Sequence, residues 1–278
     1  MHPYLIRLGG LAIPAYPLLY GSGIAVAGAL AMWLGKRDGI DARKMAHLML
    51  LMAVLILVGG RAAYVFQHVG SFSGGWLEAF DISAGGQVFY GGLILALVGI
   101  LVFARLARMR LRPLLDAVSV AAPLGLAFGR LGCFCRGCCY GRITEVPWAV
   151  RFPLHVDLAG HIVGSPAYIR HLDLGLISPM AESSLPVHPS QLYSVGAAVV
   201  LFGIMLWLWR SQRFPGALVL VFVSLYCVGR FVLEFTRDNE IVFWGLTLPQ
   251  AVSMLLFPLA GGGLFLHRWL FRERDAVA

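Results

Sequence analysis

Seven apolar stretches, each long enough to cross a lipid bilayer as a helix, dominate this sequence. They cover roughly residues 17–35, 45–66, 88–104, 114–134, 190–209, 216–236 and 247–268. About 20 mostly apolar residues suffice for one membrane span. Of the 278 residues, 13% are charged, against about a quarter in a typical soluble domain. The pattern predicts an all-α, polytopic membrane protein with about seven transmembrane helices.

Basic residues gather in alternate loops between these stretches. They are Lys36, Arg37, Arg43 and Lys44; Arg105, Arg108, Arg110 and Arg112; Arg210 and Arg213; and Arg268, Arg272 and Arg274. Because Lys and Arg accumulate in cytoplasmic loops, the N-terminus is predicted to lie outside and the C-terminus in the cytoplasm. The net charge of +8 therefore reflects membrane topology and does not indicate a nucleic-acid partner. The first apolar stretch lacks the features of a cleavable signal peptide, so the first helix is expected to be retained.

One long polar insertion, residues 142–187, interrupts the helical pattern. It carries five prolines: Pro147, Pro153, Pro166, Pro179 and Pro186. We expect turns and short strands there, forming a small external cap within a single transmembrane domain that spans residues 1–278.

Three arginines, Arg61, Arg130 and Arg230, lie in or at the ends of apolar stretches, and the predicted topology puts all three toward the external side. An ionisable residue inside a membrane is costly and marks a functional site. Guanidinium groups bind phosphate oxygens through two parallel hydrogen bonds. The three arginines therefore predict a site for a lipid phosphate, the alternative being that they snorkel to the interface.

The sixth stretch has a polar face. Tyr226, Arg230, Glu234 and Arg237 are offset by four, eight and eleven residues, which at 100° per residue places them within a stripe about 80° wide. Glu234 is expected to orient Arg230. A purely structural Arg230–Glu234 pair, and a snorkelling Arg237, are the alternatives.

Several blocks of this sequence resemble one known family. They are Tyr16 and Tyr20; Gly59-Gly60-Arg61; Gly91-Gly92-Leu93; Gly129-Arg130-Leu131-Gly132; Gly141-Arg142; His188-Pro189-Ser190-Gln191-Leu192-Tyr193; and Tyr226 through Arg230 and Glu234 to Arg237. In these blocks the chain resembles the prolipoprotein diacylglyceryl transferases. The resemblance implies transfer of the diacylglyceryl group of phosphatidylglycerol to a cysteine thiol of an acceptor lipoprotein, with release of glycerol phosphate. It also implies a multi-pass protein of the bacterial inner membrane with its active site toward the external face, and no metal or cofactor.

The resemblance also implies roles for individual residues. The expected catalytic residues are Arg130, Arg230, Tyr226, Glu234 and Tyr90. The expected lipid-binding residues are Arg61, Tyr20, Arg136, His188, Gln191 and Arg237.

Two departures from the family pattern indicate a divergent paralogue. Tyr90 stands where the family has a histidine, and Cys133, Arg136 and Cys138 stand where it has Asn, Asn and Glu. Tyr90 could act as a base only if nearby cations lowered its phenol pKa from about 10; otherwise it is an interfacial anchor. His188 could replace the missing base, or it could cap the following helix. A non-catalytic phospholipid-binding protein and a transferase with another acceptor remain alternative functions.

Four of the five cysteines fall within seven positions: Cys133, Cys135, Cys138 and Cys139. On the external side they could form structural disulfides, or one could be a reactive thiol activated by Arg130 and Arg136. The cluster alone would also fit a thiol redox protein. A metal site is a further alternative, but zinc ligands usually come from two separated pairs, so no metal is assigned.

Overall fold

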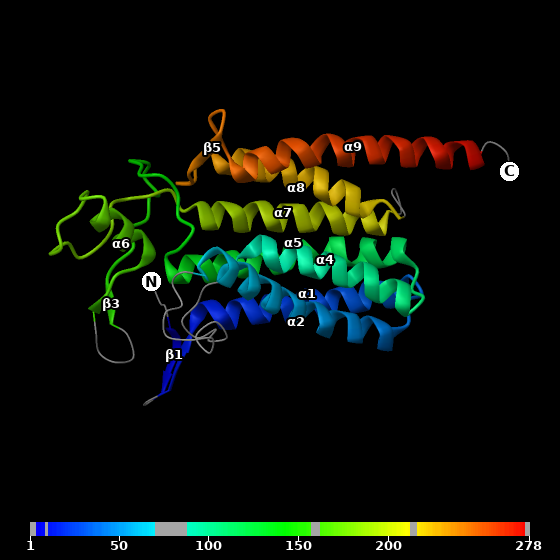
Figure 1. Cartoon of the computed structure of the whole chain (residues 1–278), viewed down its shortest axis with the longest axis horizontal. Helices are drawn as coiled ribbons and strands as arrows, with labels where there is room; N and C mark the ends of the chain where they lie inside the picture. Colours follow the sequence, from blue (N-terminus) through cyan, green and yellow to red (C-terminus); the bar gives the residue numbers. More distant parts are fainter. Residues whose placement is uncertain (1–3, 9–10, 70–87, 157–161, 212–215, 276–278) are drawn as a thin grey trace. The chain divides into compact units, whose positions relative to one another are not determined.

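The structure is a computed structural model that describes residues 4–8, 11–69, 88–156, 162–211 and 216–275 (Figure 1). In chain order its elements are β1 (Tyr4–Leu8), β2 (Leu11–Pro14), α1 (Ala15–Arg37), α2 (Ala42–Gln67), α4 (Phe89–Leu106), α5 (Leu111–Arg136), β3 (His155–Val156), β4 (Ile162–Val163), α6 (Pro166–Asp173), α7 (Ser190–Arg210), α8 (Leu218–Glu234), β5 (Ile241–Phe243), β6 (Leu246–Thr247) and α9 (Leu248–Asp275).

A long helix lies at each predicted apolar stretch, which confirms the all-α polytopic class. Within the described ranges, six helices are long and apolar enough to cross a membrane: α1, α2, α4, α5, α7 and the Leu248–His267 part of α9. Helix α8 occupies the remaining stretch with 17 residues and is not one of the six. The count of seven spans and their orientation stay predictions.

An N-terminal hairpin precedes the first long helix. Strands β1 and β2 pair antiparallel, with Leu8 opposite Leu11. The sequence did not indicate this hairpin, because a short apolar run fits a strand or a buried helix equally well. Helix α1 then begins at Ala15, with Pro17 in its first turn, where the missing N–H of proline leaves no helical hydrogen bond unmade.

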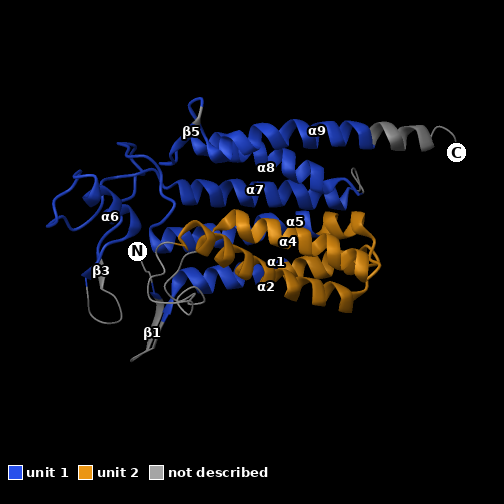
Figure 2. Cartoon of the chain, in the orientation of Figure 1, with its two compact units in different colours: residues 1–27, 118–278 blue, residues 28–117 orange. Residues whose placement is uncertain are grey.

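The chain divides into two compact units (Figure 2). Unit 1 consists of residues 1–27 and 118–278, and unit 2 of residues 28–117. Unit 1 therefore contains the first half of α1, most of α5 and all of α7, α8 and α9, whereas unit 2 contains α2 and α4.

In unit 2, α2 and α4 pack closely through glycines. A Cβ atom on Gly59 would lie 2.5 Å from the carbonyl oxygen of Gly91, and one on Gly92 would lie 2.7 Å from the carbonyl oxygen of Ile56. The backbone N–H of Val88 also donates to the carbonyl of Gly60 (3.0 Å). Small residues allow helices in membranes to approach this closely, which explains the glycines next to Arg61.

Gly92→Ala is expected to destabilise the protein by about 1–3 kcal/mol, the usual cost of forcing extra volume into a packed contact. The obstructing atoms belong to the backbone at Ile56, so the two helices must separate. Gly203→Ala in α7 is the matched control, since a Cβ there meets no atom within 4 Å. Thermal unfolding in detergent should show a lower midpoint for the first variant only, and equal midpoints for the two would contradict the contact.

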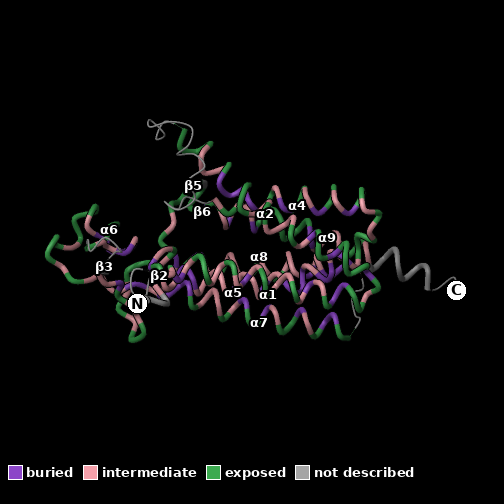
Figure 3. The backbone as a smooth tube through the Cα atoms, turned by 90° about the horizontal axis from the view of Figure 1, so that it is seen from below, coloured by how far each residue is buried: buried purple, intermediate pink, exposed green. Residues whose placement is uncertain are grey.

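In unit 1, α8 packs along both α7 and α9, and these three helices run side by side in Figure 1. Many of their large apolar side chains are exposed, including Val200 on α7, Val232 on α8 and Leu259 on α9. Figure 3 shows exposed and half-buried residues along the length of the long helices. Apolar surface of this extent is typical of helices that face lipid.

The cap region contains the short helix α6 and the two-residue strands β3 and β4. Its small core consists of Phe152, Ala167 and Val187, with Phe134 and Tyr140 packed against it. The hydroxyl of Ser165 caps α6 by accepting from the backbone N–H of Tyr168 (3.3 Å). Turns and short strands were expected in residues 142–187, but α6 was not.

The buried side chain of His171 links α6 to Leu185, near the end of the cap. Its Nδ1 accepts from the backbone N–H of Leu185 (3.1 Å), and burial lowers the pKa of His171 below its usual value although the charge of Asp238 opposes this shift. Protonation therefore favours the unfolded cap, whose histidine binds a proton more readily. The contribution of His171 to stability is present above about pH 6.5 and is lost as the pH falls below it.

We accordingly expect the protection factors of the α6 amides, which are corrected for the intrinsic pH dependence of exchange, to fall between about pH 7 and pH 5. His171→Gln, which retains a hydrogen-bond acceptor but does not titrate in this range, should flatten that dependence. His47→Gln, at an exposed position of α2, should leave it unchanged. An undiminished acid effect in His171→Gln would show that another group is responsible.

Candidate functional site

The buried carboxylate of Glu234, at the C-terminal end of α8, is the centre of a polar network in unit 1. It accepts hydrogen bonds from the guanidinium of Arg230, from the side-chain amide of Asn239 and from the hydroxyl of Thr247 (2.9 Å). Arg237 forms a longer ion pair with it, 3.8 Å from Nε to Oε2. A buried charge needs this degree of pairing, and the result is that Arg230 is held in one orientation.

Arg130 of α5 and Arg230 of α8 lie close enough to interact electrostatically, and each also interacts with the side chain of Tyr226. Both guanidinium groups are only half-buried. The two guanidinium groups therefore give the region near Tyr226 a positive charge, which Glu234 offsets only in part. This arrangement fits the phosphate of a lipid.

Arg237 does not lie on the helical face predicted for it. Helix α8 ends at Glu234, and Arg237 pairs instead with Gly141 in an isolated β-bridge. A Cβ on Gly141 would lie 2.6 Å from the Cβ of His188, so only glycine fits here. The prediction of one continuous polar stripe through Arg237 is therefore wrong in its geometry, although Arg230 and Arg237 both contact Glu234.

The first turns of α1 bring two tyrosines to α5. The rings of Tyr16 and Tyr20 stack at 5.9 Å, and the guanidinium of Arg136 lies over Tyr16 at 5.7 Å. A Cβ on Gly129 would be 3.7 Å from the ring of Tyr20. The structure thus brings Tyr20 to the turn of α5 that carries Arg130, while Arg136 is exposed.

The loop after α5 is folded back on itself. Gly137 and Cys139 both have positive φ angles, 77° and 60°. The hydroxyl of Ser190 donates to the carbonyl of Cys139 (2.9 Å), and Nε2 of Gln191 donates to the carbonyl of Cys138 (2.9 Å). The start of α7 therefore fixes the cysteine loop, including Cys139 in a backbone conformation that is strained for a non-glycine residue.

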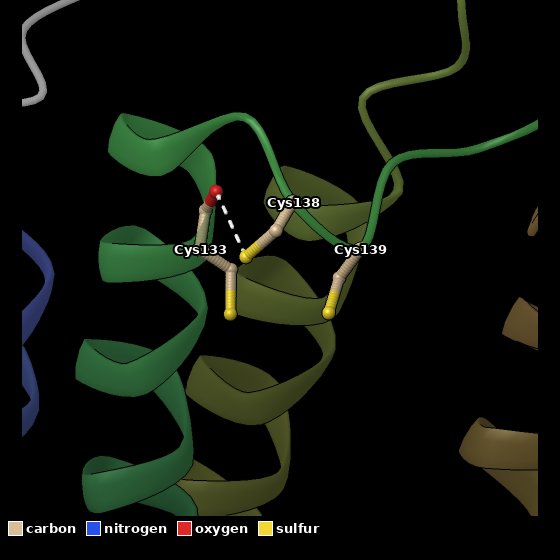
Figure 4. Close-up of side chains that lie close together, drawn as sticks. All are labelled: Cys133, Cys138 and Cys139. Carbon is tan, nitrogen blue, oxygen red and sulfur yellow. Dashed lines mark hydrogen bonds between the residues drawn. The ribbon is translucent and has the colours of Figure 1, made fainter. Parts of the chain in front are cut away.

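This fold of the loop brings three thiols together (Figure 4). The sulfur atoms of Cys133, Cys138 and Cys139 all lie within 4.8 Å of one another. All three are free thiols, as are Cys135 and Cys227, which lie outside the cluster. Hydrogen bonds from Cys133 and Cys138, assisted by the positive charges of Arg130 and Arg237, lower the pKa of Cys139. The sequence predicted neither the selection of these three thiols nor their spacing.

Three buried polar atoms near this loop have no hydrogen-bond partner among the described residues: Oε1 of Gln191, and Nε and Nη1 of Arg237. Of these, Nε has the 3.8 Å ion pair with Glu234. Buried polar groups are almost always paired. An acceptor and a charged donor without partners, next to Cys138 and Glu234, are groups that a polar ligand or an ordered water would pair with.

His188 lies before α7, which begins at Ser190. Its ring contacts the hydroxyl of Tyr193 at 3.3 Å, and the same hydroxyl accepts from the indole N–H of Trp148 (2.6 Å). The alternative that His188 caps α7 does not hold, because the N-cap residue is Pro189, which forms no side-chain capping bond; lipid binding by His188 stays a prediction.

Arg61 and Tyr90 belong to unit 2. Arg61 is buried and lies 5.3 Å from the ring centre of Tyr64. Tyr90 is half-buried in the first turn of α4 and packs edge to face with Phe89. Their participation in the phosphate site stays a prediction.

Sequence reasoning missed Asn239, Thr247 and Ser190 as supports of the site. Asn239 and Thr247 lie after α8; Asn239 falls between two predicted spans, and Thr247 is the first residue of the predicted 247–268 stretch. Ser190 belongs to a block quoted for the resemblance. The polar side chains in so short a link between two apolar helices were the available signal, but their common partner, Glu234, appears only in three dimensions.

Comparison with known proteins identifies the family. The sequence profile of the family described as prolipoprotein diacylglyceryl transferase matches residues 3–266. A phosphatidylglycerol–prolipoprotein diacylglyceryl transferase of Bordetella bronchiseptica is 34% identical over 95% of this chain and 94% of its own length. Proteins of the same name from Coxiella burnetii (30%, 98% of this chain and 97% of the relative) and Cupriavidus metallidurans (31%, 99% and 95%) are also similar. The chain therefore belongs to the prolipoprotein diacylglyceryl transferase family.

Proposed function

We propose that this protein transfers the diacylglyceryl group of phosphatidylglycerol to the cysteine thiol of a prolipoprotein, at the external face of the bacterial inner membrane. The observation that carries this proposal is the pair Arg130 and Arg230, which share Tyr226 while Glu234 fixes the second arginine. The substrates are those in the names of the relatives. The exposed apolar helix surfaces allow a lipid to enter sideways while its acyl chains stay in the bilayer.

In the proposed reaction the acceptor sulfur attacks the glyceryl carbon that carries the phosphate ester oxygen. The acceptor thiol gives up its proton to solvent, a C–S bond forms, the C–O bond breaks, and the C–O electron pair leaves with glycerol phosphate. The leaving group gains negative charge during this step. Preorganised cations such as Arg130 and Arg230 stabilise that charge in the transition state, and Tyr226 donates to the phosphate or its headgroup.

The buried atoms without partners fit the rest of the headgroup. Nη1 of Arg237 and Oε1 of Gln191 supply a charged donor and an acceptor, which match a phosphate oxygen and a glycerol hydroxyl respectively. Arg61, Tyr20, Arg136 and His188 are assigned as further lipid contacts, and Tyr90 as a catalytic group.

The test is transfer from vesicles of radiolabelled phosphatidylglycerol to a synthetic prolipoprotein peptide, using the full-length protein in detergent. Thioether-linked label on the peptide is the expected product, and a peptide with serine in place of cysteine should receive none. Phospholipid binding without transfer to any thiol would instead identify a non-catalytic lipid-binding protein, and transfer to another thiol compound would change the acceptor.

A further inference from the structure

The three clustered thiols of unit 1 have the composition and spacing of a zinc site. Zinc binds thiolate sulfur at about 2.3 Å, which separates the sulfurs of one tetrahedral site by about 3.8 Å. The three sulfurs lie within 4.8 Å of one another, so small side-chain rotations bring them to one ion. Figure 4 shows the sulfurs of Cys133, Cys138 and Cys139 projecting into the same space from α5 and from the loop after it.

The protein holds this cluster in place from outside. Ser190 and Gln191 bind the carbonyls of Cys139 and Cys138, and the thiol of Cys138 contacts the carbonyl of Cys133 at 3.8 Å. Cys139 adopts a positive φ angle of 60° within this loop. Preorganisation of this kind is what a metal site needs.

The cluster offers three protein ligands that differ in burial. Cys133 is buried and Cys138 is half-buried, whereas Cys139 is exposed. Three protein ligands and one open position characterise catalytic zinc sites, whereas structural zinc sites have four protein ligands. Three thiolates and Zn²⁺ would carry one net negative charge, and Arg130 and Arg237, which interact with Cys139, would offset it.

We infer that Cys133, Cys138 and Cys139 bind a zinc ion whose fourth position takes the cysteine thiol of the acceptor. This inference rests on the proposed function, because it assigns the role of the site within that reaction. The spacing of the cysteines along the sequence does not predict a metal site. It does not show that the loop after α5 returns to Cys133.

The chemistry balances without an oxidant or a reductant. Each of the three protein thiols releases a proton to solvent when zinc binds, and the acceptor thiol does the same when it enters the fourth position, because a thiol coordinated to zinc is deprotonated. The zinc-bound sulfur then attacks the glyceryl carbon. The thioether product is a weak ligand and leaves, while the C–O electron pair departs with glycerol phosphate.

The first test measures metal directly. The full-length protein purified without chelator should contain one zinc per chain, and replacement by Co²⁺ should give thiolate-to-cobalt charge-transfer absorption with the visible bands of a tetrahedral ion. Cys133→Ser, Cys138→Ser and Cys139→Ser should each lose this signal. Cys135→Ser is the matched control, since it lies in the same segment but outside the cluster, and it should keep the signal.

The second test separates an activating metal from a structural one. Adding the cysteine peptide to the cobalt protein should shift its bands, whereas the serine peptide should not. If the absorption bands of the bound cobalt did not change when the cysteine peptide was added, the activating role of the metal would be overturned. Undiminished transfer by protein shown to be metal-free, or a disulfide within the cluster in the active protein, would overturn the site and leave the proposed function standing. A spectral shift without any transfer would support thiol coordination and reject the transferase.

Discussion

Arg130→Ala and Arg230→Ala are each expected to reduce diacylglyceryl transfer by at least 10²–10³-fold, or about 2.7–4 kcal/mol of transition-state stabilisation, the usual cost of removing one preorganised electrostatic donor. The loss should be larger in kcat than in apparent affinity for phosphatidylglycerol, because the charge that these arginines stabilise develops on the leaving phosphate. Lysine should restore only part of the rate at either position, since an ammonium group cannot make two parallel hydrogen bonds.

The control for this experiment is Arg151→Ala. Arg151 is an exposed cap residue, and the same change in charge at that position should leave transfer unchanged. Folding of each variant is checked by its thermal midpoint in detergent. Wild-type turnover by both Arg130→Ala and Arg230→Ala would refute the assignment of the phosphate site.

Glu234→Ala is expected to have the largest effect on stability, about 3–5 kcal/mol, which is typical of removing one partner from a buried ion pair. The substitution leaves Arg230 and the buried Arg237 without their common carboxylate and removes the acceptor for Thr247. Glu234→Gln should lose less, because its amide oxygen still accepts a hydrogen bond. Chemical or thermal unfolding of the detergent-solubilised protein measures the difference.

Transfer activity provides a second measurement on the same variants. Because Glu234 orients Arg230, Glu234→Gln should lower kcat even at temperatures where the protein remains folded. Glu240→Gln changes an exposed carboxylate a short distance along the chain and should affect neither stability nor kcat. A Glu234→Gln variant with normal kcat would reduce Glu234 to a purely structural role.

The positions of the long helices followed from the sequence, because a bilayer requires a run of apolar residues for each span. The predicted 114–134 stretch corresponds to α5, for example, and the 190–209 stretch to α7. The conformations of the short segments between the long helices were harder to predict. The apolar residues before α1 form a hairpin, and the polar cap contains α6; in both segments the short-range pattern fits several conformations.

The sequence by itself determined the membrane class and the family, and it predicted Arg130, Arg230 and Glu234 as site residues because a charge in an apolar helix is rarely without function. Only the tertiary structure decided that α8 ends before Arg237, that Asn239 and Thr247 share Glu234, and that three of four neighbouring cysteines converge. The physical reason is that hydropathy and helical spacing are properties of a single segment, and they determine only the structure of that segment. Hydrogen bonds to a buried carboxylate and the return of a loop onto its own helix depend on contacts between segments.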